Sequence, residues 1–220
     1  MSNNTDQNFE KLSLDFLICC YFGQSENLGK AAIDRAYVDM AAHTIDIPDL
    51  TAKWKMRYEA SCTISKRLTA YKPRDKFDEW HRKTITEMKR LYNGNLTDGQ
   101  AQKWLNMTIK YLFVFNSLLS LLGTPDKRLS SFHNFLTSTD ASEYKVPIDG
   151  FVLKGLKIKS SCWSKLEEKE YANVEQQLVY EDKDFDFFSE LEKWEEFSRL
   201  KKPDKGTYAR YIEDEGYESY

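Results

Sequence analysis

The stretch from Thr97 to Leu122 reads TDGQAQKWLNMTIKYLFVFNSLLSLL and has the pattern of one long helix. Thr97 and Gln100 are spaced as a capping box, in which each side chain bonds the backbone N–H of the other residue. Apolar residues then recur at helical spacing over more than half of the circumference, namely Trp104, Leu105, Ile109, Tyr111, Leu112, Phe115, Leu118, Leu119 and Leu122. A helix this apolar must be surrounded by other helices, so we expect it to form the centre of an all-α domain.

The rest of the chain also favours helices. Its 220 residues include only nine glycines and five prolines, which suits long helices with short connections. We expect a single multi-helix domain packed around residues 97–122, with residues 1–163 as the core. Residues 164–202 are predicted to be an acidic helical extension docked on that core, and residues 203–220 a flexible acidic and aromatic tail.

The apolar centre raises the question of a membrane. Lys103 and Lys110 interrupt its first half, and the uninterrupted part from Tyr111 to Leu122 is too short to cross a bilayer. The N-terminal region lacks the basic start of a signal peptide. Four cysteines without a Cys-x-x-Cys spacing are typical of reduced thiols. We therefore expect a cytoplasmic protein with no membrane partner.

Charge is divided unevenly along the chain. From Ser164 to the end there are 17 acidic and 9 basic residues, whereas Thr51–Tyr92 holds 12 basic and 5 acidic residues. Such asymmetry can mark a basic contact surface beside an acidic segment. The two predicted helices within 51–92 would carry that surface.

The candidate polyanion-binding residues lie in rows on these two helices. Lys76, Lys83 and Arg90 repeat every seven residues, and a second row runs beside them. Rows of cations can neutralise phosphates and gain affinity from released counterions. The alternative is a solvated face with local ion pairs to Glu79 and Glu87. The full set is Lys53, Arg57, Lys76, Arg82, Lys83, Lys89 and Arg90.

A polar stripe on the central helix gives the weaker catalytic candidates. Lys103, Asn106 and Lys110 lie at i, i+3 and i+7 and so share one face. We interpret this face as the exposed edge of the helix, with lysine stems covering apolar neighbours. The alternative is that buried lysines act as bases or nucleophiles, with Asn106 orienting a substrate.

Asp149 is the remaining catalytic candidate. It ends the stretch Val146-Pro147-Ile148-Asp149, which resembles the Pro-Val-Asp that precedes a helix in helix-hairpin-helix DNA glycosylases. In that family the aspartate works with an upstream lysine at the tip of a glycine-rich hairpin. This chain has no Gly-x-Gly turn in the residues before Asp149, and the similarity covers only a few residues. The simpler interpretation is that Asp149 caps a helix or follows a turn.

Motifs for other chemistry are missing from the sequence. The three histidines are not spaced as metal ligands, so we expect no metal. The sequence has no nucleotide-binding or serine-hydrolase motif, so we expect no cofactor. We favour a non-enzymatic cytoplasmic binding or accessory protein whose basic surface contacts nucleic acid or an acidic protein. One alternative is a nucleic-acid-acting enzyme, lyase- or glycosylase-like, using Lys103 or Lys110 with Asp149. The other is a structural homo-oligomer subunit.

Two structural criteria separate the first two functions. The enzyme needs Lys103 or Lys110 to converge with Asp149 in a pocket. The binding protein needs Lys76, Lys83 and Arg90 to be exposed and without acidic partners.

Overall fold

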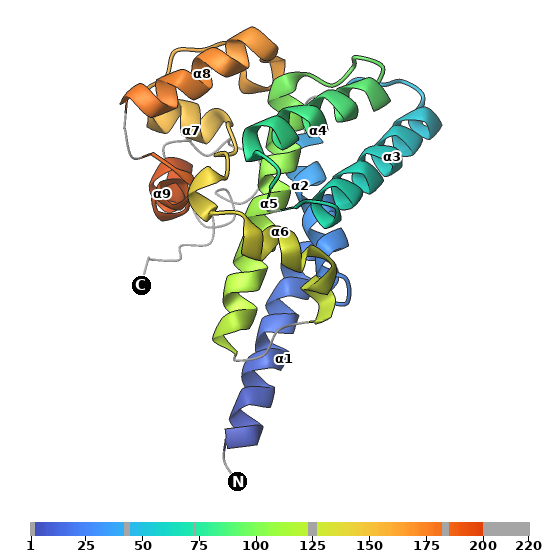
Figure 1. The fold of residues 1–220 in the computed structure, drawn as a ribbon, viewed down its shortest axis with the longest axis vertical. Coiled ribbons are helices and arrows are strands. Elements are labelled where there is room, and N and C mark those ends of the chain that lie inside the picture. The colour runs from blue at the N-terminus through green and yellow to red at the C-terminus, as the bar shows by residue number, and fades with distance from the viewer. Residues whose placement is uncertain (1–2, 42–44, 73, 123–126, 182–184, 200–220) are drawn as a thin grey trace, which may run out of the picture.

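The computed structural model describes residues 3–41, 45–72, 74–122, 127–181 and 185–199. Within these ranges all of the regular secondary structure is helical, which confirms the predicted all-α class (Figure 1). The α-helices are α1 (Asn3–Phe22), α2 (Leu28–Ala41), α3 (Leu50–Thr69), α4 (Phe77–Leu91), α5 (Asp98–Leu121), α6 (His133–Ser138), α7 (Gly150–Gly155), α8 (Glu168–Glu181) and α9 (Phe187–Arg199). Short 3-10 turns cover Lys127–Phe132 (η1), Ala141–Glu143 (η2) and Trp163–Lys165 (η3).

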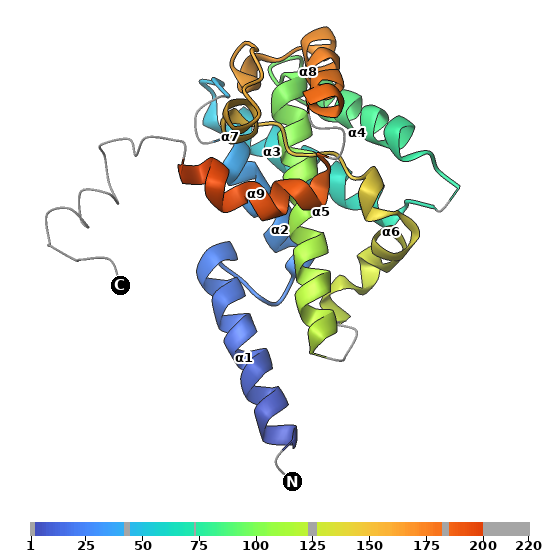
Figure 2. The same ribbon diagram turned by 90° about the vertical axis from the view of Figure 1, so that its left-hand side faces the viewer.

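Helix α5 is the centre of the domain. It starts with the predicted capping box between Thr97 and Gln100, and every residue from Asp98 to Leu112 is buried. Figures 1 and 2 show α5 running through the molecule, and in Figure 1 α3 and α4 lie on its right while α7, α8 and α9 lie on its left. Its second half descends beside α1 towards the end of the molecule where the N-terminus lies.

Helix α2 packs along α5 at close range. Ala31, Ala32 and Ala36 are fully buried, and such small side chains let two helix backbones approach. The Trp104 indole of α5 donates a hydrogen bond to the Ile33 carbonyl at 3.0 Å, so the two helices are also joined by a polar contact. This pairing fixes the side of α2 that faces the site described below.

A second apolar cluster lies beside the main core and is formed largely by α7, α8 and the segment before α7. Helix α9 reaches back to α5, where the fully buried Phe187 ring meets Phe113 at a centroid distance of 5.3 Å. The predicted boundaries at 163/164 and 202/203 stay predictions, and the predicted tail at 203–220 lies outside the described residues. Within the described ranges, no helix combines the length and hydropathy that crossing a membrane requires.

Replacing Leu112 with Ala should lower the free energy of unfolding by about 2–5 kcal/mol, because Leu112 is fully buried and its removal leaves a cavity. Leu121→Ala is the control on the same helix, since Leu121 is 83% exposed, and it should change stability by less than about 0.5 kcal/mol. Urea denaturation measures both. Equal stability of the two variants would contradict the central position of α5.

Candidate functional site

The polar stripe of α5 is buried, so its interpretation as an exposed edge is wrong. Lys103, Asn106 and Lys110 are only 8%, 0% and 6% exposed. Two segments distant in sequence cover this face: the extended residues 146–149 and helix α9. Their polar groups meet those of the stripe.

Two amide side chains of α5 hold the extended segment in place. Gln102 donates from Nε2 to the Ile148 carbonyl at 2.8 Å and accepts at Oε1 from the Ile148 N–H at 3.2 Å. Asn106 donates from Nδ2 to the Val146 carbonyl at 3.2 Å. The pattern is that of a strand pairing, with side-chain amides in the place of a neighbouring backbone. It brings the next residue, Asp149, beside the first turns of α5.

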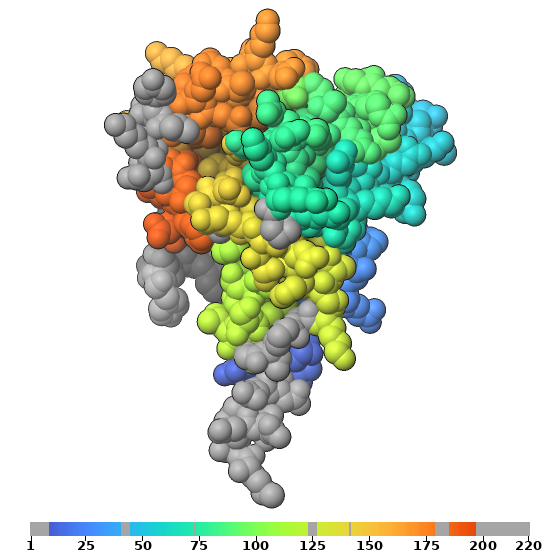
Figure 3. All heavy atoms as spheres, in the orientation of Figure 1, coloured from blue at the N-terminus to red at the C-terminus, as the bar shows by residue number. Residues whose placement is uncertain are grey.

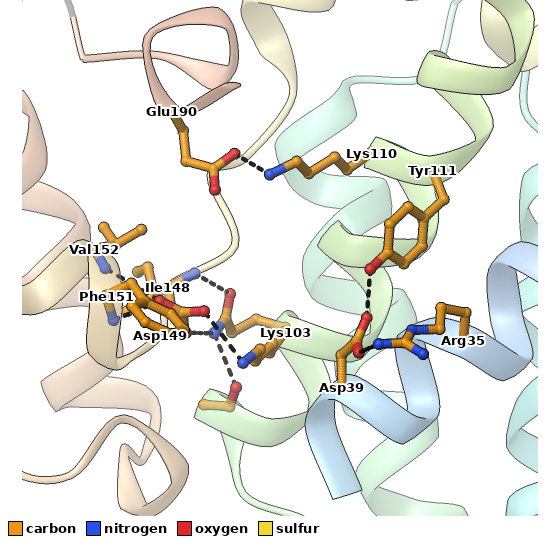
Figure 4. A network of polar contacts seen from close by, with 12 residues as sticks. Arg35, Asp39, Lys103, Lys110, Tyr111, Ile148, Asp149, Phe151, Val152 and Glu190 are labelled. Carbon is orange, nitrogen blue, oxygen red and sulfur yellow. Dashed lines mark hydrogen bonds and ion pairs between the residues drawn. The ribbon is translucent and has the colours of Figure 1, made fainter. Parts of the chain in front are cut away.

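Asp149 uses its two carboxylate oxygens for different purposes. Oδ1 accepts from the backbone N–H groups of Phe151 at 2.8 Å and Val152 at 3.1 Å, so Asp149 is the N-cap of α7, as the simpler interpretation expected. Oδ2 lies 3.2 Å from Lys103 Nζ (Figure 4). The Lys103 ammonium also lies 4.4 Å from the centroid of the Trp163 ring, within cation–π range.

The Lys103–Asp149 pair lines a cavity of about 500 Å³. This size falls in the range of small-molecule sites, which are mostly apolar with a few converging polar groups. Aromatic rings make up much of the wall, and they come from α1, α5, α7, η3 and α9. The aromatic residues are Tyr21, Tyr111, Phe151, Trp163 and Trp194.

A second polar group on the wall comes from α2. Asp39 accepts a hydrogen bond from the Tyr111 hydroxyl and pairs with Arg35 at 2.9 Å (Figure 4). The Arg35 guanidinium lies 4.1 Å from the centroid of the Tyr21 ring. Burial lowers the pKa of Arg35, but Asp39 together with Tyr21 and Tyr111 more than offsets this, so the pKa of Arg35 is raised overall. The cavity therefore carries a fixed cation and a fixed anion on the α2 wall as well.

Lys110 makes a separate pair with α9. Its Nζ lies 2.5 Å from Glu190 Oε2 and 4.7 Å from the Trp194 ring centroid. Burial raises the pKa of Glu190, and Lys110 opposes that rise. Neither Lys110 nor Glu190 is among the residues that line the cavity. Of the two lysine candidates, the structure thus brings Lys103 together with Asp149 in a pocket.

Five of the seven predicted polyanion-binding residues have partners in the structure, and one of them, Arg82, donates from Nε to the Asp78 carbonyl at 3.4 Å. Arg57 pairs with Asp34 at 3.1 Å, and Lys83 pairs with Glu79 at 2.7 Å. Two more are held by groups distant in sequence: Lys53 donates to the Ile45 carbonyl, and Lys89 pairs with Asp98 and Glu167.

Lys76, Arg82 and Arg90 are exposed on or beside α4. Figure 3 shows this face, where α4 (teal) meets α8 (orange) and the segment around 142–148 (yellow). Lys76 and Arg82 also line a cleft of about 820 Å³ at this junction, but Asp78, Glu79 and Glu175 line it too. The surface is therefore mixed in charge rather than uniformly basic.

Several site residues escaped the sequence argument. Trp163 and Trp194 were not singled out as partners for the lysines, because cation–π contacts between distant segments leave no local pattern. Arg35 and Asp39 do have a local signal, since they are an i,i+4 pair on α2. Among the described residues, no group of three or more His, Cys, Asp or Glu side chains is arranged to hold a metal.

Comparisons with protein-family models, curated proteins and solved structures found no match for this chain. The function must therefore be argued from the site itself.

His81 contacts Asn106 of the polar stripe, and its pKa should be lower than that of a free histidine. Its Nε2 donates to Asn106 Oδ1 at 2.7 Å, and burial lowers its pKa from 6.5 to about 4, helped by Lys145 and opposed by the Asn106 bond and Asp78. Between pH 7 and pH 4 the His81 imidazole is protonated in the unfolded chain but stays largely neutral in the folded chain. The free energy of unfolding should therefore fall by about 3 kcal/mol more in the wild type than in His81→Gln.

Urea denaturation at several pH values measures this difference, which should level off below about pH 4. An NMR titration of the imidazole is the direct control. A folded-state pKa of His81 near 6.5 would contradict the buried, neutral histidine.

Proposed function

We propose that this protein is a nucleic-acid-acting enzyme, glycosylase- or lyase-like, in which Lys103 is the nucleophile and Asp149 its acid–base partner. The observation that carries the proposal is the contact between Lys103 Nζ and Asp149 Oδ2, 3.2 Å apart on the wall of an aromatic-lined cavity. Lysine amines form covalent Schiff-base intermediates with sugar aldehydes and other carbonyl carbons. Flat aromatic walls suit a planar base.

The local sequence resemblance points the same way. In helix-hairpin-helix DNA glycosylases the Pro-Val-Asp aspartate works with an upstream lysine, and here Asp149 of Pro-Ile-Asp lies beside an upstream lysine. That lysine sits on the second turn of α5 rather than on a glycine-rich hairpin. The resemblance supports the pairing of these two residues, although the element that carries the lysine differs from the one in that family.

The first chemical step removes the base. Lys103 passes its ammonium proton to Asp149, which leaves a neutral amine and a neutral carboxylic acid. The amine lone pair then forms a bond to C1′ of the sugar while the C1′–N bond to the base breaks. The electron pair of that bond stays on the base nitrogen, which takes the proton from Asp149.

The second step opens the sugar. Asp149, again a carboxylate, takes a proton from the new C1′–nitrogen adduct. The nitrogen lone pair forms a C=N bond as the C1′–O4′ bond breaks, and O4′ receives the proton from Asp149. Attack of water on the resulting iminium releases the sugar aldehyde and restores the Lys103 ammonium, so atoms and charges balance.

Borohydride trapping tests this chemistry, because it reduces the iminium to a stable amine. The purified chain would be mixed with oligonucleotides that carry damaged bases or an abasic site, in single and double strands. We expect a covalent protein–DNA adduct on a denaturing gel. It should vanish in Lys103→Gln and form about 10²–10⁴ times more slowly in Asp149→Asn, which keeps a good helix cap.

Lys154→Gln is the matched control, because Lys154 is an exposed lysine that lines the same cavity. Its adduct should form at the wild-type rate. The proposal is wrong if no substrate gives an adduct, or if trapping survives in Lys103→Gln and is lost in Lys110→Gln.

A second candidate is the non-enzymatic binding protein, for nucleic acid or an acidic protein, and the exposure of Lys76, Arg82 and Arg90 favours it. Changing Lys76, Lys83 and Arg90 to Ala should then flatten the salt dependence of oligonucleotide binding by about 0.9 log units per lost phosphate contact. Fluorescence anisotropy at several salt concentrations measures the slope. An unchanged slope would leave α4 as a solvated face. For both candidates we also propose a cytoplasmic location and the formation of homo-oligomers.

A further inference from the structure

A second aromatic hollow lies on the other flank of α2. Trp54 and Tyr58 are one helical turn apart on α3 and are 62% and 71% exposed. Both line a hollow of about 430 Å³ between α2, α3 and η1. Small polar side chains complete its wall: Asn27, Ser61, Ser65 and Ser131. Large exposed aromatic side chains beside polar groups are typical of a binding site.

One aspartate brings two cations into this hollow. Asp34 pairs with Lys30 through Oδ2 and with Arg57 through Oδ1, so the trio keeps a net positive charge. The Arg57 guanidinium lies 5.0 Å from the Trp54 ring centroid and 4.3 Å from that of Tyr37. Arg57 thus contacts the Trp54 ring, while more than half of the Trp54 surface remains exposed to solvent.

More positive charge lies along α3. Lys53 and Lys55 are next to Trp54 in the sequence, and Lys53 donates to the Ile45 carbonyl. Lys66 and Arg67 lie nearer the end of the helix, where Arg67 pairs with Glu87. Lys55 is exposed between Trp54 and Arg57 in the sequence. Aromatic rings interleaved with cations are what single-stranded nucleic acid requires, because bases stack on rings and phosphates meet cations.

Helix α2 connects this hollow with the cavity that holds Lys103. Asp34 lines the hollow, whereas Val38 and Asp39 line the cavity. Val38 follows Asp34 by about one helical turn, a rise of about 6 Å along the axis of α2. Val38 lines the cavity and is 49% exposed, so this part of α2 is open to solvent. A strand with one nucleotide in the cavity would cross α2 beside Val38 to reach the hollow.

We infer that Trp54 and Tyr58 form a stacking platform for single-stranded nucleic acid, which holds the bases that flank the nucleotide in the Lys103 cavity. The inference rests on the proposed function for its biological role. Its physical basis, exposed rings beside cations in a hollow, is independent of the Lys103 chemistry.

The test is the affinity of the full chain for a fluorescently labelled undamaged oligothymidine strand at low salt, measured by anisotropy. Trp54→Ala and Tyr58→Ala should each weaken binding about tenfold, because loss of stacking on one ring costs about 1–3 kcal/mol. Leu50→Ala is the matched control, since Leu50 lies one turn before Trp54 and is 67% exposed but has no ring. It should bind as the wild type does.

Three results would overturn the platform. They are absence of oligothymidine binding at low salt, equal losses in Leu50→Ala and Trp54→Ala, and tighter binding of duplex than of single strand. The first would leave this face to an apolar protein partner. Borohydride trapping separates the two proposals: if wild type binds the strand through Trp54 but forms no adduct, the platform stands and the Lys103 chemistry falls. If trapping depends on Lys103 but Trp54→Ala binds normally, the Lys103 chemistry stands and the platform is wrong.

Discussion

Burial of polar side chains on the central helix is the constraint from which the site follows. Gln102 and Asn106 are fully buried on α5, and each buried amide group left without a partner would cost about 1–3 kcal/mol. The backbone of the extended residues 146–149 supplies several of those partners, and His81 and the Gly99 carbonyl supply others. This pairing places Asp149, at the end of the segment, 3.2 Å from Lys103. The buried polar groups of the core need hydrogen-bond partners, and this requirement sets the geometry of the candidate reaction centre.

The N-terminal turn of α5 closes the site from the other side. A Cβ on Gly99 would lie 1.9 Å from the Trp163 carbonyl oxygen, so only glycine permits this approach. The Gly99 N–H bonds the Leu166 carbonyl at 2.9 Å, and the Thr97 hydroxyl bonds the Ser164 carbonyl at 2.9 Å. These contacts hold η3 against the helix start. They place the Trp163 ring over the Lys103 ammonium.

Local patterns allowed the helices to be predicted, and distant contacts explain what was missed. The capping box at Thr97 and the Lys83–Glu79 pair depend on residues within one turn, so spacing alone reveals them. The polar stripe was assigned to solvent because its partners lie far along the chain: Asp149 for Lys103 and Glu190 for Lys110. Two lysines that lie two helical turns apart have the same spacing whether water or a distant carboxylate neutralises them. Periodicity therefore could not show that this face is buried.

The two lysine–carboxylate pairs of α5 differ in what they can do. Glu190 is 1% exposed and its pair with Lys110 joins α9 to α5 outside the cavity, so this pair serves to hold the helices together. Asp149 is fixed by the cap of α7 through one oxygen and offers the other to Lys103 at the cavity wall. A nucleophile must meet its substrate, and of these two lysines it is Lys103 that lines the cavity. The same residue types at two positions on one helix thus give one structural tie and one candidate reaction centre, and access to the cavity is what separates them.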